Sequence, residues 1–214
     1  MENGQVIEKT KDYVRRSCKG DVGHDWFHVE RVWTMARKIA EEEKADVFIV
    51  EMAALLHDVD DFKFNDSDGT AVKSKAWLKS LDIDNTIIDK IIHIVENVSF
   101  KGSAEKEKIQ TLEGKVVQDA DRLDALGAIG VARAFTFAGH TNMCIYDPSI
   151  KVRGNMKFSE YRTHERSAVN HFYEKLLLLK DRMNTKTGKR LAEGRHKFME
   201  QYLEQFFKEA EGER

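Results

Sequence analysis

The stretch FIVEMAALLHDVDD, residues 48–61, is an almost unbroken apolar run that closes on one histidine and three aspartates. Val50, Ala53 and Ala54 fall on one face of a helix, and that face continues at His57, seven residues after Val50. The flanking leucines make nearly the whole circumference apolar, as in a helix that is buried in a core. We therefore predict a buried helix over residues 47–59 that carries His57 near its end.

The segment before this helix carries a second apolar stripe with a histidine on it. We predict a helix over residues 26–44, whose stripe consists of Val32, Met35, Ala36 and Ile39. His28 lies one turn before Val32 on the same face. Asp25 stands immediately before the helix, where an N-cap residue is expected.

A third ionisable side chain lies on an apolar face further along the chain. In the helix that we predict over residues 115–138, Asp121 shares a face with Val117, Ala125 and Ala128. A carboxylate among small apolar residues needs a partner, because burying it alone is costly. Asp121 is therefore a candidate ligand.

The remainder of the chain also favours helices. Pro148 is the only proline, and long stretches without proline alternate with short clusters of Gly, Asp, Ser and Asn. We predict an all-α fold with helices near residues 4–19, 26–44, 47–59, 69–80, 84–97, 106–113, 115–138, 160–182 and 187–210. The 214 residues suit one domain, a helical bundle over residues 1–214 with its core at about 20–140 and packing helices at about 158–210.

Composition narrows the range of partners and compartments. The 35 basic and 37 acidic residues leave a net charge of -2, which gives no general attraction to nucleic acid or to an anionic membrane. Charges interrupt each apolar run near the N-terminus, unlike in a signal peptide. Cys18 and Cys144 form no CxxC pair, which argues against a disulfide framework and a thiolate zinc site. We expect a cytoplasmic protein without nucleic-acid or membrane partners, and the sequence leaves its oligomeric state open.

The ionisable residues on apolar faces are best explained by a shared cation. Each group, buried unpaired, would destabilise the fold, and one cation that binds all of them removes that cost. With Asp58, they form a set of two imidazoles and two carboxylates, which suits Mn²⁺, Fe²⁺, Co²⁺, Ni²⁺ or Mg²⁺ better than a structural zinc ion. We predict one divalent metal ion, with manganese favoured. Taken one at a time, the same residues would read as ordinary core histidines and helix-end carboxylates.

The order of these residues resembles that of a known family. His28, the doublet His57–Asp58 that closes AALLHD, and Asp121 in DADRLD are similar to the H…HD…D signature of HD-domain phosphohydrolases. The likeness covers nearly the whole chain, through blocks such as GHDWFHVERV, NVSFKG and VVQDADRLDALGAIGVAR. The resemblance implies a helical HD fold, a single divalent metal ion, and hydrolysis of phosphoesters or phosphoanhydrides, often in nucleotides.

Two further residues are candidates for contact with the reacting groups. Asp61 matches the region where some HD hydrolases carry an acidic residue that handles the attacking water, although DVDDFKFND also fits a solvated turn. Lys101, next to Gly102, is a candidate phosphate contact, because a glycine lets the backbone approach a phosphate closely. The alternative is a surface lysine.

Two more candidates flank the predicted ligands in the sequence. His24 forms a second HD doublet with Asp25, but we expect Asp25 to cap the helix and His24 to contact the substrate or a metal ligand. Arg122 can orient Asp121, pair with Asp124 or reach a phosphate of the substrate. We favour the orienting role.

These residues suggest a hydrolytic mechanism and several rival functions. We expect a metal-activated water to attack phosphorus, with Asp58 or Asp61 accepting its proton and Lys101 and His24 neutralising the phosphate charge. From subfamily resemblance, the preferred substrate is a nucleoside triphosphate that is cut to a monophosphate and pyrophosphate. A nucleotidase or a cyclic-nucleotide phosphodiesterase remains an alternative. A sensor that binds metal and nucleotide without turnover is the rival from another class.

Overall fold

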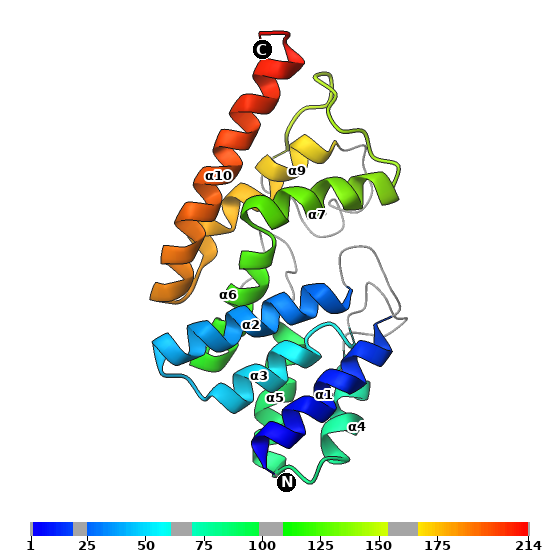
Figure 1. Ribbon diagram of the computed structural model, residues 1–214, viewed down its shortest axis with the longest axis vertical. Coiled ribbons are helices and arrows are strands. Elements are labelled where there is room, and N and C mark those ends of the chain that lie inside the picture. Colours follow the sequence, from blue (N-terminus) through cyan, green and yellow to red (C-terminus); the bar gives the residue numbers. More distant parts are fainter. Residues whose placement is uncertain (1, 19–24, 61–69, 99–108, 154–166, 214) are drawn as a thin grey trace. The chain divides into compact units, whose positions relative to one another are not determined.

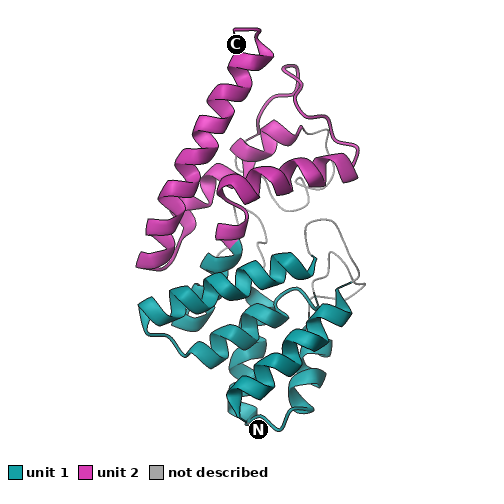
Figure 2. Ribbon diagram, in the orientation of Figure 1, with its two compact units in different colours: residues 1–100, 107–121 teal, residues 101–106, 122–214 magenta. Residues whose placement is uncertain are grey.

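The computed structural model describes residues 2–18, 25–60, 70–98, 109–153 and 167–213 (Figure 1). Within these residues the secondary structure is helical, apart from turns and one isolated bridge between Cys144 and Ser167. The predicted all-α fold is confirmed. The helices group into two compact units (Figure 2), of which unit 1 comprises 1–100 and 107–121 and unit 2 comprises 101–106 and 122–214.

Unit 1 is organised around one buried helix, α3 (Val47–Leu56). Every residue from Ile49 to Leu56 is buried, as the apolar sequence predicts. α3 packs against three helices of the same unit, which are α1 (Asn3–Ser17), α2 (Trp26–Glu43) and α5 (Asn85–Asn97). α4 (Val72–Lys79) packs in turn on α5. The core of unit 1 is therefore built on the helix that leads to His57.

The predicted stripe of α2 is confirmed by burial. Val32, Ala36 and Ile39 are inaccessible to solvent, and Met35 is half-buried. α3, in contrast, ends at Leu56, three residues before the predicted end. His57 takes the C-cap position, and residues 57–60 form a turn that carries Asp58 and Asp60. This turn determines where Asp58 and Asp60 lie.

The predicted helices over residues 106–113 and 115–138 are divided differently in the structure. α6 (Leu112–Asp124) runs through Gly114, where a Cβ would lie 2.7 Å from Ile109 Cγ2, so this glycine serves close packing and does not end a helix. The break comes at residues 125–126, before α7 (Gly127–His140). Gly127 has a φ of 71°, whereas a right-handed helix requires a negative φ, so α6 cannot continue through this residue. The prediction that Ala125 and Ala128 continue the helical face of Asp121 is therefore wrong, because α6 ends at Asp124.

Unit 2 contains a second difference from the predicted helices. The described part of the helix predicted over residues 160–182 is α9 (Ala168–Glu174), followed by two 3₁₀ turns, Leu176–Leu178 and Lys180–Arg182. Leu176 and Leu179 are nonetheless buried. An apolar spacing of three residues fits a 3₁₀ turn as well as an α-helix, so the pattern could not distinguish them.

The last helix, α10 (Lys186–Ala210), starts one residue before the predicted helix and packs on α7 within unit 2. Its apolar face joins an aromatic cluster, in which Tyr202 lies 5.9 Å from Phe135 and 6.1 Å from Phe172 between ring centroids. This confirms the packing role that we predicted for the late helices. No helix among the described residues is both long enough and apolar enough to cross a membrane.

Candidate metal centre

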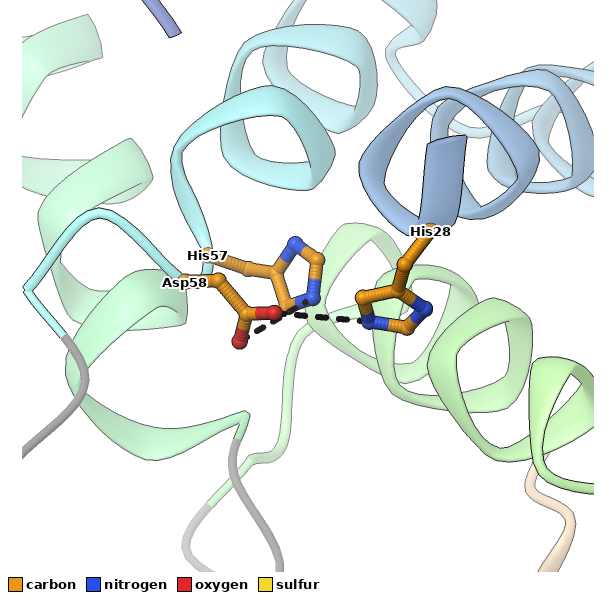
Figure 3. Close-up of side chains that lie close together, drawn as sticks. All are labelled: His28, His57 and Asp58. Carbon is orange, nitrogen blue, oxygen red and sulfur yellow. Dashed lines mark ion pairs between the residues drawn. The ribbon is translucent and has the colours of Figure 1, made fainter. Parts of the chain in front are cut away.

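His28 lies in the first turn of α2, and the start of this helix is fixed by a side-chain cap. The Asp25 carboxylate accepts a hydrogen bond of 2.9 Å from the backbone N–H of His28, which confirms the predicted capping role of Asp25. The His28 side chain is 1% exposed, and its ring points from α2 toward His57 and Asp58 (Figure 3). The cap thus sets where α2 begins and where this imidazole lies.

His57 is oriented by the backbone of its own helix. Its ring Nδ1 lies 2.7 Å from the carbonyl oxygen of Ala54, and because a carbonyl can only accept, Nδ1 is the donor. In the neutral ring, Nε2 then carries the lone pair. Nε2 is buried and forms no hydrogen bond. A buried nitrogen acceptor that faces a cluster of carboxylates and makes no hydrogen bond is the strongest indication that this cluster binds a cation.

Two carboxylates approach both imidazoles. Asp58 reaches the two rings with different oxygens, Oδ1 lying 3.3 Å from His57 Nε2 and Oδ2 lying 3.4 Å from His28 Nε2 (Figure 3). Asp121 Oδ1 lies 3.6 Å from His28 Nε2 and 4.0 Å from His57 Nε2. All four side chains belong to unit 1, so the structure brings the four predicted ligands together.

These separations fit a shared ion. Ligand atoms about 2.1 Å from one ion, at angles of about 90° to 120°, lie roughly 3.0 to 3.6 Å apart. The observed distances of 3.3, 3.4 and 3.6 Å fall within that range, and the distance of 4.0 Å lies slightly above it. Suitable atoms of His28, His57 and Asp58 also lie within 4.8 Å of one another. The chemistry of the donors, two imidazole nitrogens and carboxylate oxygens, suits a divalent first-row metal.

Exposure rises from the histidines to the carboxylates. Both imidazoles are 1% exposed, whereas the side chain of Asp58 is 12% exposed and that of Asp121 is 29% exposed. Water can therefore reach the cluster on its carboxylate side. A substrate that replaces water would have to approach the centre from the same side.

A polar contact in the core links the two helices that carry the histidines. Trp33 of α2 donates its indole N–H to Glu51 Oε1 of α3 at 3.0 Å, and Glu51 is 6% exposed. Burial raises the pKa of the Glu51 carboxyl, against the opposing effects of Arg37 and of the Trp33 hydrogen bond. Glu51 was not among the predicted residues, although it is the one carboxylate within the apolar run FIVEMAALL.

Cys18 is close enough to the carboxylates to be affected by their charge. Burial raises the pKa of the Cys18 thiol, and the negative charges of Asp58 and Asp25 raise it further. The protonated thiol is therefore favoured at neutral pH.

Of the other predicted site residues, Arg122 is the one that lies within the described part of the chain. His24, Asp61 and Lys101 lie outside the described residues. Arg122 is buried, and its Nη1 donates to the carbonyl oxygen of Arg182 within unit 2. The orienting and phosphate-binding roles of Arg122 stay predictions.

Comparison with known proteins gives consistent matches. The profile of the HD domain family matches residues 26–126. The uncharacterised protein YpgQ of Bacillus subtilis is 45% identical over 194 residues, covering 89% of this chain and 86% of YpgQ. A crystal structure of YpgQ in complex with ADP superposes with a TM-score of 0.79 at 38% identity, over 98% of this chain and 97% of that one.

Two further crystal structures are similar over almost their entire length. A Lactobacillus plantarum protein gives a TM-score of 0.87 at 37% identity and covers 99% of this chain and 100% of its own. A Bacillus thuringiensis protein described as an HD-superfamily hydrolase gives a TM-score of 0.78 at 43% identity, covering 98% and 99%. The similarity therefore extends over both units.

Proposed function

Because this chain belongs to the HD-domain phosphohydrolase superfamily, we propose that it is a divalent-metal-dependent enzyme that hydrolyses a phosphoanhydride or phosphoester bond of a nucleotide. The observation that carries the proposal is the buried His57 Nε2, which makes no hydrogen bond and lies 3.3 Å from Asp58 Oδ1. A buried polar atom of this kind normally has a partner. A divalent cation supplies that partner and compensates the adjacent carboxylates.

His28, His57, Asp58 and Asp121 would hold the cation, and manganese is the ion that we favour. Held there, a divalent ion would lower the pKa of a water molecule and polarise a phosphoryl oxygen of the substrate. The protein contributes fixed geometry: the Ala54 carbonyl orients the His57 ring, and the Asp25 cap fixes the start of the helix that bears His28. The donor atoms are thus preorganised before a ligand arrives.

In the proposed reaction, a water molecule attacks phosphorus in line with the bond that breaks. One water proton passes to a carboxylate of the protein, the water oxygen forms the new P–O bond, and the bridging oxygen leaves with the departing phosphate. Asp58 can accept this proton, because its side chain is partly exposed and already lies at the centre. Asp61 is the alternative acceptor, and Lys101 and His24 are the proposed phosphate contacts.

A nucleotide is the substrate class that we favour. YpgQ, whose sequence matches this chain over most of its length, has been crystallised with ADP. A diphosphate ligand is consistent with a site that acts on phosphoanhydrides. We propose cleavage of a nucleoside triphosphate between the α and β phosphates, giving a monophosphate and pyrophosphate.

The test is hydrolysis of a panel of nucleoside mono-, di- and triphosphates and cyclic nucleotides, with Mn²⁺ or with a chelator, in ¹⁸O-labelled water. We expect Mn²⁺-dependent release of monophosphate and pyrophosphate, with the label showing which phosphorus was attacked. Asp58→Ala serves as the inactive control. Nucleotide-dependent thermal stabilisation without product from any nucleotide would refute the enzyme and favour a sensor.

A further inference from the structure

The turn after α3 ends in a buried carboxylate that contacts α4. Asp60 Oδ1 accepts a hydrogen bond of 3.0 Å from the backbone N–H of Lys73. Asp60 Oδ2 accepts two more from Ser74, of 2.9 Å from the backbone N–H and 2.6 Å from the hydroxyl. Asp60 is 6% exposed and Ser74 is fully buried. These are charge-assisted hydrogen bonds in a setting that excludes water.

Asp60 caps a helix that does not cap itself. The residue at the N-cap position of α4 is Ala71, which provides no side-chain hydrogen bond. Lys73 and Ser74 are the second and third residues of α4, whose N–H groups an N-cap side chain ordinarily satisfies. Asp60 satisfies them from more than ten residues earlier in the chain, and its negative charge is favourable at a helix N-terminus.

α4 is itself held in place within unit 1. The ring of Trp77 stacks on Tyr13 of α1, with centroids 4.2 Å apart and an interplanar angle of 4°. The Trp77 indole N–H also donates to the Thr10 hydroxyl at 3.0 Å. Asp60 is therefore attached to a helix that is anchored against α1.

The turn that carries Asp58 is thus fixed at both ends. At its start, His57 Nδ1 is bonded to the Ala54 carbonyl, and the N–H of Val59 donates to the Leu56 carbonyl at 3.1 Å. At its end, Asp60 is fixed to α4. We propose that Asp60 is a positioning residue for the metal centre, which keeps the Asp58 carboxylate between the two imidazoles. This inference rests on the metal site of the proposed function.

The experiment measures the Mn²⁺ dissociation constant by calorimetry, well below the unfolding midpoint, for the parent, Asp60→Ala, Asp60→Asn and Asp84→Ala. Asp84 is the matched control, because it also caps a helix of unit 1, accepting from Thr86 at 2.8 Å at the start of α5. Loss of a residue that orients a metal ligand typically weakens metal affinity about 10- to 100-fold.

We expect Asp60→Ala to weaken Mn²⁺ binding about 10- to 100-fold and Asp84→Ala to leave it unchanged. Asp60→Asn should lie between, because it keeps the shape but replaces one acceptor oxygen with a donor that faces an N–H group. If Asp60→Ala does not fold, Asp60→Asn decides.

The outcomes separate the two proposals. A lower unfolding midpoint with the parent's Mn²⁺ affinity would show that Asp60 is only a structural cap and would overturn the inference. A parent protein that binds no Mn²⁺ would overturn the proposed function, and the inference with it.

Discussion

Gly127→Ala tests the packing that ends α6 and begins α7. Gly127 has a φ of 71°, and a Cβ at this position would lie 3.1 Å from both Cβ and Cγ of Arg195. Arg195 donates in turn to the carbonyl oxygen of Leu123, near the end of α6. The new methyl group therefore meets both a disfavoured backbone conformation and a side chain that is held by its own hydrogen bond.

The left-handed conformation costs an alanine about 1–2 kcal/mol, and the crowding against Arg195 adds to this cost. Alanine also lowers the conformational entropy of the unfolded chain, which offsets about 0.4–1 kcal/mol of the loss. We expect a net loss of about 1–2 kcal/mol and an unfolding midpoint roughly 2–8 °C lower. Gly194→Ala is the control, because its Cβ meets nothing within 4 Å in the middle of α10. It should stabilise the protein by about 0.5–1 kcal/mol.

Thermal unfolding of the two variants and the parent, followed by circular dichroism, measures both effects. If Gly127→Ala were as stable as the parent, the close approach of Gly127 and Arg195 would be wrong. Opposite signs for the two glycines are the expected result, since both substitutions add the same methyl group.

Two other predictions concern a buried charge and a proposed phosphate contact. The raised pKa of Glu51 means that the folded state binds its proton more tightly than the unfolded state, so Glu51 lowers stability as pH rises above its unfolded pKa. Glu51→Gln removes this ionisation. Urea unfolding should therefore show that the free energy of unfolding of Glu51→Gln, relative to that of the parent, is higher at pH 7.5 than at pH 4. The same difference at both pH values would contradict the burial argument. Lys101→Ala should lower kcat/KM about ten- to a hundredfold at unchanged metal content, the loss expected for a charge-assisted phosphate contact. Parent-like kinetics would make Lys101 an ordinary surface lysine.

The buried faces of α2 and α3 could be predicted from the sequence, because helical periodicity alone determines which residues share a face. His28 and His57 were placed correctly on these faces. Their meeting with Asp58 and Asp121 depends on how helices pack, which periodicity does not specify. That these residues would meet followed instead from the cost of burying unpaired polar groups and from the resemblance to HD-domain proteins.

Features that depend on distant partners were missed. The helix break before Gly127 involves a close approach of Arg195, which lies in α10, and nothing near Gly127 in the sequence indicates it. Gly114 appeared to be a helix boundary, but it is a site of close packing against Ile109. Asp60 resembled one more acidic residue in a polar turn, since the backbone groups that it caps are in another helix.

The central claim is that His28, His57, Asp58 and Asp121 hold one divalent cation. Mn²⁺ titration of chelator-treated protein, with free Mn²⁺ counted by electron paramagnetic resonance, tests it most directly. We predict about one Mn²⁺ per chain for the parent, as four ligands around a single point imply, and loss of this site in His57→Ala. A parent that takes up no Mn²⁺, or a His57→Ala variant that binds it as tightly as the parent, would contradict the account.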